Sequence, residues 1–164
     1  MNIKLNLGCG RTLIPSDEDS KWINVDYNNT ADVKHDLRKP LPFDMNSIDY
    51  ILASHIAEHF TQYEWAVVKK DWYRALKRGG RLEVRVPDLE VACKEFLSGK
   101  NRYVGMVSAH AMIYGSSEVV GQIHHQGFDK AKLQEDLKQE GFRIVSCENV
   151  SPVDWQIVCV AEKI

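Results

Sequence analysis

Several features that would place a protein in a special class are missing from this sequence of 164 residues. No apolar run approaches the ~20 residues that a membrane-spanning helix needs, and the chain contains no internal repeat or low-complexity segment. Lys and Arg do not cluster, and the formal net charge of −2 gives no reason to expect a nucleic-acid-binding surface. We therefore expect neither a membrane protein nor a nucleic-acid-binding protein.

Cysteine is also scarce. The four cysteines form no C-x-x-C pair, and the first predicted strand begins at residue 3, so that no secretory signal is expected. Free thiols without a signal predict a reduced, cytoplasmic protein. The length and a hydrophobic fraction of 44% predict a single domain over residues 1–164 with a core of its own.

The N-terminal stretch predicts a strand that ends in a glycine turn. Apolar and polar residues alternate over residues 3–7, and Gly8-Cys9-Gly10 follows directly. Glycines can adopt positive φ angles and allow the backbone to approach a ligand closely. Open α/β sheets bind nucleotide-like cofactors beyond the carboxyl ends of their strands, at such turns. We therefore expect a cofactor site at this turn.

The remaining elements follow in the order of an α/β sheet. Further strands are predicted over residues 22–26, 32–37, 47–53, 80–86, 142–147 and 155–160. Helices are predicted from a cap at Thr61 to Gly79, and over residues 89–97, 101–113 and 129–141. Residues 11–21 and 27–31, where crossover helices would normally stand, have the composition of loops. The prediction is a Rossmann-like, mostly parallel seven-stranded sheet with an antiparallel C-terminal edge and reduced helices after the first two strands.

The strand over residues 80–86 is charged along one face. Arg81, Glu83 and Arg85 alternate with apolar residues, whereas a parallel strand covered by helices on both sides is normally apolar on both faces. We infer that one face of the sheet is thinly covered, or is covered by a partner subunit. A homodimer formed through that face is therefore a hypothesis.

Asp26 ends the second predicted strand. In sheets that bind dinucleotides, a carboxylate at this position accepts hydrogen bonds from ribose hydroxyls. A surface acid that merely ends a strand is the simpler alternative, but the glycine turn upstream favours the ribose role.

Five stretches of the chain, taken in order, resemble the class I S-adenosylmethionine (SAM)-dependent methyltransferases that act on small molecules. They are L-N-L-G-C-G, I-N-V-D, the run over residues 35–60, L-K-R-G-G-R-L-E-V-R-V-P-D and the run over residues 127–145. The resemblance is to the type 11-like members and covers nearly the whole chain. It implies SAM as the cofactor and a small-molecule acceptor whose oxygen, nitrogen or carbon receives the methyl group.

The resemblance also implies roles for individual residues. The glycine turn would approach the methionine and ribose of SAM, the second-strand acid would hold the ribose hydroxyls, and the Asp36 carboxylate and Leu37 N–H would meet the adenine. Residues at the end of the fourth strand would lie near the transferred methyl group. The implied cofactor-binding residues are Leu7, Gly8, Cys9, Gly10, Asp26, Asp36, Leu37, Ser54 and His55.

Two positions depart from the pattern of this family. Asn6 stands where many members have an acid, and Thr12 stands where a third glycine is often found. The amide of Asn6 keeps the capacity for hydrogen bonds but removes a negative charge near a cationic cofactor. Both departures bear on affinity more than on fold.

Histidines are the candidate catalytic residues. Methylation of a hydroxyl requires removal of a proton, and histidine titrates near neutral pH. The candidates for a general base are His55, His59 and His124, and a hydrogen-bonded histidine without a catalytic role is the alternative for each. Tyr114 and the pair His124-His125 are candidates for acceptor contacts, because the loop that follows residue 114 would have to cover the site.

Some of these motifs also allow interpretations other than methyl transfer. Residues 55–59 match H-x-x-E-H, a zinc-protease pattern that requires both histidines on one helical face, but they directly follow a buried strand, so no metal is predicted. Cys9 has no base beside it and is interpreted as a small residue in a tight turn. An NAD(P)-dependent oxidoreductase lacks support without a third glycine and a crossover helix to hold a pyrophosphate. A non-catalytic SAM-binding subunit stays open.

Overall fold

The computed structural model describes residues 1–99, 108–116, 121–150 and 155–164. Seven strands of these residues form one sheet in the order β3-β2-β1-β4-β5-β7-β6. They are β1 (Asn2–Leu7), β2 (Ser20–Asp26), β3 (Val33–Lys34), β4 (Ile48–Ser54), β5 (Leu76–Pro87), β6 (Phe142–Asn149) and β7 (Gln156–Lys163). β1 to β5 are parallel, and β7 runs antiparallel between β5 and β6. The predicted Rossmann-like sheet is confirmed.

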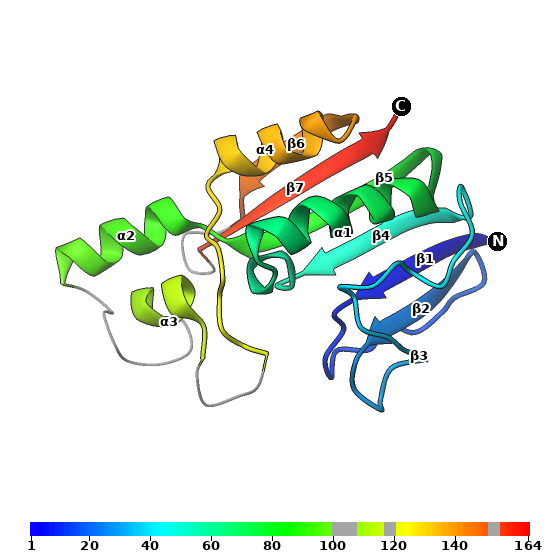
Figure 1. The fold of residues 1–164 in the computed structure, drawn as a ribbon, viewed down its shortest axis with the longest axis horizontal. Coiled ribbons are helices and arrows are strands. Elements are labelled where there is room, and N and C mark those ends of the chain that lie inside the picture. The colour runs from blue at the N-terminus through cyan, green and yellow to red at the C-terminus, as the bar shows by residue number, and fades with distance from the viewer. Residues whose placement is uncertain (100–107, 117–120, 151–154) are drawn as a thin grey trace.

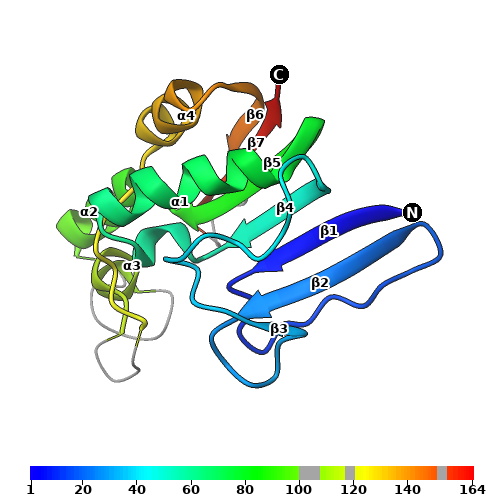
Figure 2. The ribbon, with the colours of Figure 1, turned by 45° about the vertical axis from the view of Figure 1, so that its right-hand side comes forward.

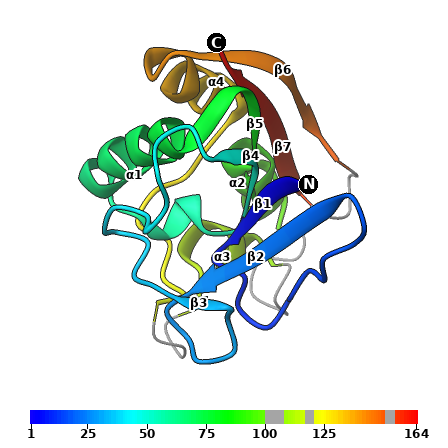
Figure 3. The same cartoon turned by 90° about the vertical axis from the view of Figure 1, so that its right-hand side faces the viewer.

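The helices divide into two groups. α1 (Gln62–Ala75) and α4 (Lys130–Gln139) both lie on one face of the sheet (Figure 3). α2 (Leu89–Ser98) and α3 (Ala109–Tyr114) lie beyond the carboxyl ends of the parallel strands (Figures 1 and 2). A short 3₁₀ turn, η1 (Ala57–His59), connects β4 to α1. Among the described residues, no helix has the length and apolar character needed to cross a membrane.

The main core lies between the sheet and α1. The predicted capping box starts this helix: Thr61 N donates to Glu64 Oε2 at 2.8 Å, and Glu64 N donates to Thr61 Oγ1 at 3.3 Å. Trp65 and Trp72 lie on the buried face of this helix, and their rings meet edge to face with centroids 5.6 Å apart. The prediction that these tryptophans belong to the core is therefore confirmed.

The connection from β1 to β2 is an extended segment rather than a crossover helix, as predicted. Two buried asparagines on the strands hold it. Asn6 Nδ2 donates to Thr12 O at 2.9 Å and to Asn24 Oδ1 at 2.9 Å. Asn24 also accepts from Ile14 N at 2.9 Å and donates to Ile14 O at 3.2 Å. Because a carboxylate has no N–H to donate, the amide of Asn6 suits this connection where an acid would not.

The sheet face opposite α1 is polar, and its charges pair with one another. Glu83 accepts from Arg85 Nε at 2.7 Å and also from the Tyr50 hydroxyl. Lys4 Nζ lies 5.5 Å from the centroid of the Trp22 ring, a cation–π contact. These pairs explain how a charged stripe is accommodated on central strands. A homodimer through this face stays a prediction, which the mass of the protein in solution would test.

The helix that was predicted to reach Gly79 is shorter, so that prediction is wrong at its C-terminal end. α1 ends at Ala75, and Leu76 is already extended and pairs with Ile48 of β4. Lys163 Nζ donates to Leu76 O at 2.8 Å and so satisfies a carbonyl at the helix end. Gly79, at φ 79°, lies where the register between β4 and β5 shifts. Pairing of Leu76 with β4 therefore ends the helix before Gly79, the residue that was expected to stop it.

The predicted third strand over residues 32–37 is also too long, since β3 is only Val33–Lys34. Asp32 Oδ2 accepts from Asn24 N and Nδ2, at 2.8 Å each. Asp36 begins a turn in which its carbonyl accepts from Lys39 N at 2.9 Å. The Asp36 side chain also accepts from Arg38 N at 3.1 Å, and a local bond of this kind competes with a strand ladder. The helix predicted over residues 101–113 lies partly outside the described residues, and α3 is its described part.

Candidate functional site

The glycine turn at the end of β1 has the geometry that the sequence predicted. Gly8 and Gly10 have φ angles of 66° and 53°, in the left-handed region that favours glycine. A Cβ on Gly8 would lie 2.8 Å from the Ile56 side chain, so the space there admits only glycine. Gly10 N donates to Asp26 Oδ2 at 2.9 Å and joins the turn to the end of β2.

Asp26 is buried and lines a cavity of about 410 Å³. Its second oxygen, Oδ1, accepts from Asn28 N at 3.0 Å, so two backbone amides fix the carboxylate. We call this space the Asp26 cavity. Its walls include Asp26, Tyr27, Asp36, Leu37, Ile56 and His59. Three of the predicted cofactor-binding residues, Asp26, Asp36 and Leu37, therefore meet in one cavity.

Asp36 is a charged member of that wall. Arg38 Nε donates to Asp36 Oδ1 at 2.8 Å, and this guanidinium lowers the pKa of the carboxyl below its ordinary value. The carboxylate is therefore ionised at neutral pH and able to accept a hydrogen bond from a ligand. Leu37, next to it, is 7% exposed and gives the cavity an apolar patch.

A second cavity, of about 460 Å³, lies beside the first. We call it the histidine cavity. Its walls include His55, Glu58, His59, Met112, His124 and Gln156. His59 lines both cavities. The three predicted candidate bases are thus brought together, and His59 forms part of the boundary between the two spaces.

His55 follows β4 directly and has a φ angle of 52°, an uncommon value for a residue with a side chain. Its Nδ1 lies 3.3 Å from Glu58 Oε1, and its Nε2 lies 3.3 Å from Gln156 Oε1. Contact with the Glu58 carboxylate raises the pKa of His55, and burial opposes this effect. Backbone strain of this kind is concentrated at functional sites in proteins.

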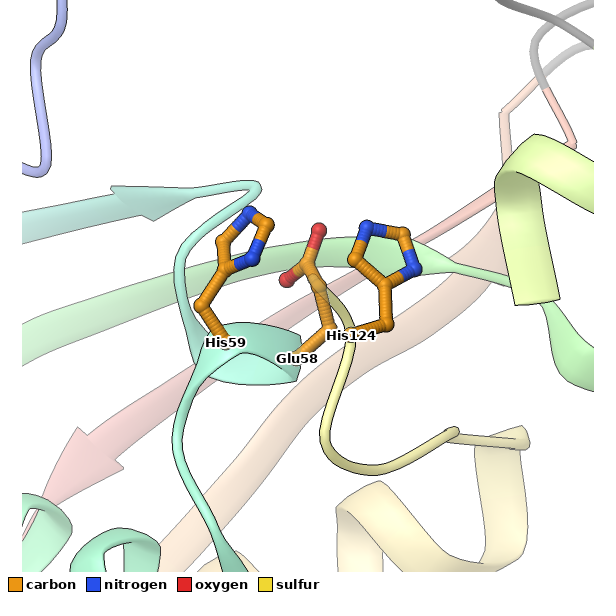
Figure 4. A group of neighbouring side chains, drawn as sticks. All are labelled: Glu58, His59 and His124. Carbon is orange, nitrogen blue, oxygen red and sulfur yellow. The ribbon is translucent and has the colours of Figure 1, made fainter. Parts of the chain in front are cut away.

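The other two histidines are held by backbone carbonyls. His59 Nδ1 lies 3.0 Å from Ile123 O, and His124 Nδ1 lies 2.9 Å from Met112 O. Their rings meet edge to face with centroids 5.0 Å apart, and Glu58 lies close to both (Figure 4). Burial lowers the pKa of His124, so its neutral form is favoured.

Several residues predicted for the site line neither cavity through their side chains. The side chain of Leu7 is fully buried in the core, and Ser54 lines neither cavity. Tyr114 is 59% exposed and lines neither cavity, whereas His125 contributes only its backbone N–H, which donates to Glu58 O at 2.8 Å. Cys9 lines neither cavity, and burial together with Asp26 raises the pKa of its thiol to about 11. This supports the interpretation of Cys9 as a turn residue.

The zinc-protease arrangement is not formed by residues 55–59. His55 precedes η1 with a left-handed backbone, so His55 and His59 do not share a helical face. The residues that sequence reasoning missed are Glu58 and Gln156. The sequence marks Glu58 only as the glutamate of the H-x-x-E-H match, and its burial depends on the turn after His55. No motif or spacing marks Gln156, because only the tertiary fold brings the start of β7 to the cavity.

The sheet order and the cavity beyond β1 and β2 agree with the class that the sequence resembles, the SAM-dependent methyltransferases. Residues 5–84 match the family model described as a methyltransferase domain. Together the match and the fold confirm the predicted class, a class I SAM-dependent methyltransferase with SAM as its cofactor. No curated protein sequence matches this chain.

Solved structures share this fold at low sequence identity. A Pyrococcus horikoshii OT3 protein is 19% identical with a TM-score of 0.70, over 99% of this chain and 82% of its own. A SAM-dependent methyltransferase from Methanosarcina mazei is 15% identical with a TM-score of 0.68, over 99% and 92%. The 1,6-didemethyltoxoflavin-N1-methyltransferase of Burkholderia thailandensis, with bound 1,6-didemethyltoxoflavin and S-adenosylhomocysteine, is 15% identical with a TM-score of 0.66, over 98% and 70%.

Proposed function

We propose that this chain transfers the methyl group of SAM to a small molecule bound in the histidine cavity. The observation that carries the proposal is the position of His59, which lines both that cavity and the Asp26 cavity. A cofactor in one space and an acceptor in the other would meet beside this residue. Direct transfer between two bound molecules requires such adjacent sites.

The Asp26 cavity offers groups that suit the adenosine part of SAM. Asp26 stands at the end of β2, where a carboxylate accepts from ribose hydroxyls. Asp36 can accept from the exocyclic amine of adenine, and Leu37 supplies an apolar surface for the ring. The methionine part would then extend along the glycine turn toward His55. The positive sulfonium would lie near carboxylates, which favours it electrostatically.

The histidine cavity offers groups that suit a small polar acceptor. A positioned acceptor needs little further help, because the sulfonium is a strong electrophile and alignment alone can lower the barrier by several kcal/mol. The nitrogens of His55, His59 and His124 can orient a hydroxyl or amine and accept its proton. The Burkholderia thailandensis structure, which holds an acceptor together with S-adenosylhomocysteine, supports a small-molecule substrate for this fold.

Release of S-adenosylhomocysteine tests the proposal. The purified chain is incubated with SAM and a panel of small hydroxyl, amine and nitrogen-heterocycle acceptors. We expect acceptor-dependent turnover that is lost in Asp26→Ala and retained in Asp44→Ala, which removes an exposed carboxylate outside both cavities. Binding of SAM without turnover on any acceptor would instead support the non-catalytic subunit. Binding of NAD without SAM would support the oxidoreductase, and either result would overturn the proposal.

A further inference from the structure

The wall of the histidine cavity contains a buried carboxylate with no hydrogen-bonding partner. The side chain of Glu58 is 2% exposed. Neither of its oxygens accepts a hydrogen bond from the described residues, and its ion-pair contact is His55 Nδ1, 3.3 Å from Oε1. A buried carboxylate with one ion-pair contact and no hydrogen bond is incompletely compensated, which is costly and calls for a further partner. A bound cation would provide one.

Two histidines lie close to this carboxylate (Figure 4). One ligand atom from each of Glu58, His59 and His124 can be chosen such that all three lie within 4.8 Å of one another. Ligands at ~2.1 Å from a tetrahedral zinc ion are themselves ~3.4 Å apart. The three side chains are therefore close enough to share one ion after side-chain rotation.

Both imidazoles are oriented as metal ligands usually are. Carbonyl oxygens only accept hydrogen bonds, so the contacts with Ile123 O and Met112 O assign the ring proton of each histidine to Nδ1. The lone pair of Nε2 is then available in His59 and in His124. Metal-binding histidines almost always donate their other N–H to a backbone carbonyl or a carboxylate in this way.

The backbone holds the cluster in place before any ligand binds. Gln126 Nε2 donates to Ala57 O at 3.2 Å and to Phe60 O at 3.1 Å, on either side of Glu58. His125 N donates to Glu58 O at 2.8 Å. These bonds join the loop that carries His124 to the turn that carries the other two residues, so little ordering is required on binding.

We infer that Glu58, His59 and His124 form a binding site for one first-row divalent cation of the kind that Zn²⁺ represents. Two imidazole nitrogens and one carboxylate oxygen are a ligand set of catalytic zinc and non-haem iron sites, which keep further coordination positions open. Since all three residues line the histidine cavity, the open positions face that cavity. The class of ligand that would occupy them is an oxygen donor.

The consequence for catalysis rests on the proposed function. The ion would occupy the Nε2 lone pairs of His59 and His124, which could then not serve as bases. A hydroxyl of the acceptor that bound the ion would have a lowered pKa and could lose its proton to water. Its oxygen then forms a bond to the methyl carbon while the carbon–sulfur bond of SAM breaks, and the electron pair of that bond stays on sulfur. The acceptor is therefore expected to carry a hydroxyl group.

Calorimetric titration of the chelator-treated chain with Zn²⁺, without SAM or acceptor, tests the site directly. We expect one ion per chain, and affinity reduced by more than the ~10- to 100-fold that loss of an outer-shell partner costs, in Glu58→Gln, His59→Gln and His124→Gln. His125→Gln, which removes an exposed histidine next to the cluster, is the matched control and should bind as the wild type does.

Binding of Co²⁺ to the wild-type chain tests the site even if a variant does not fold. Co²⁺ in the wild-type chain should show the intense visible absorption of a tetrahedral or five-coordinate site, and Zn²⁺ should displace it. Absence of saturable binding by either ion, or equal binding in the wild type and a folded His124→Gln variant, would overturn the inference. Binding of Zn²⁺ without methyl transfer would contradict the proposed function alone, because this titration requires neither SAM nor acceptor.

Discussion

The two halves of the sheet are held together by different means. From β4 onward, helices pack against the strands through apolar side chains such as Trp72 and Leu133, which are fully buried. From β1 to β3 the connections contain no helix, and the buried amides of Asn6 and Asn24 fix the first of them, which is extended. We refer to these as the helical half and the extended half.

The comparison shows what a cofactor site of this type requires. The extended half supplies Gly10 and Asp26, which are positioned by hydrogen bonds to each other and to Asn28. A crossover helix is therefore not needed to place them. The helical half supplies His59, through the short turn before α1. The candidate site lies at the junction of the two halves.

The largest expected loss of stability comes from the helical half. Trp72→Ala removes a fully buried indole and leaves a cavity, which costs about 3–5 kcal/mol in the free energy of unfolding. Urea denaturation measures this change. Val67→Ala on the same helix is the control, because Val67 is 61% exposed and should change stability very little. A loss below about 1 kcal/mol in Trp72→Ala would contradict the description of this core.

The extended half should respond to loss of a polar side chain. Asn24→Ala leaves Ile14 N without its partner and removes the bond from Asn6, which we expect to cost about 2–3 kcal/mol. The same denaturation experiment measures it. Asn29→Ala, which removes one exposed contact with Lys34 Nζ, should be nearly neutral. Equal effects of the two substitutions would mean that the amides do not hold this half together.

A smaller loss is expected at the start of α1. Thr61→Ala removes the hydroxyl that accepts from Glu64 N, which should cost about 1 kcal/mol. Thr61→Ser keeps the hydroxyl and should recover most of the loss. If both variants are equally destabilised, the effect comes from lost packing of the methyl group and not from the cap.

The two halves should also differ in the reactivity of their thiols. This prediction concerns labelling rates and not stability. Burial raises the pKa of Cys9 to about 11, whereas Cys159, opposite on β7, lowers the pKa of Cys147 to about 7. At pH 8 most Cys147 is thiolate, against on the order of one thousandth of Cys9. Iodoacetamide labelling followed by mass spectrometry should therefore modify Cys147 long before Cys9. Labelling of Cys9 first would contradict these environments.

Much of the fold could be predicted from local sequence signals. The alternation in β1, the glycine turn and the capping box at Thr61 each determine structure within a few residues, and all three were found. The end of α1 was predicted wrongly, because Leu76 pairs with Ile48 from a distant part of the chain. The residues around Gly79 do not indicate a tertiary contact of this kind.

The candidate site also has one part that the sequence predicts and another that it does not. Asp26 and Asp36 follow strand ends at spacings that a sequence displays, and both lie in one cavity. The burial of Glu58 depends on the left-handed backbone of His55 and on Gln126, whose side chain bonds to the carbonyls on either side of Glu58. No spacing rule joins these positions, so this buried carboxylate could be found only in the structure.

Calorimetric titration with S-adenosylhomocysteine tests the central claim, that an extended half without crossover helices holds SAM. We predict saturable binding of one molecule per wild-type chain, strongly weakened in Asp26→Ala, and no heat with NAD. Absence of S-adenosylhomocysteine binding to the folded wild-type chain, or binding that Asp26→Ala leaves unchanged, would contradict the account.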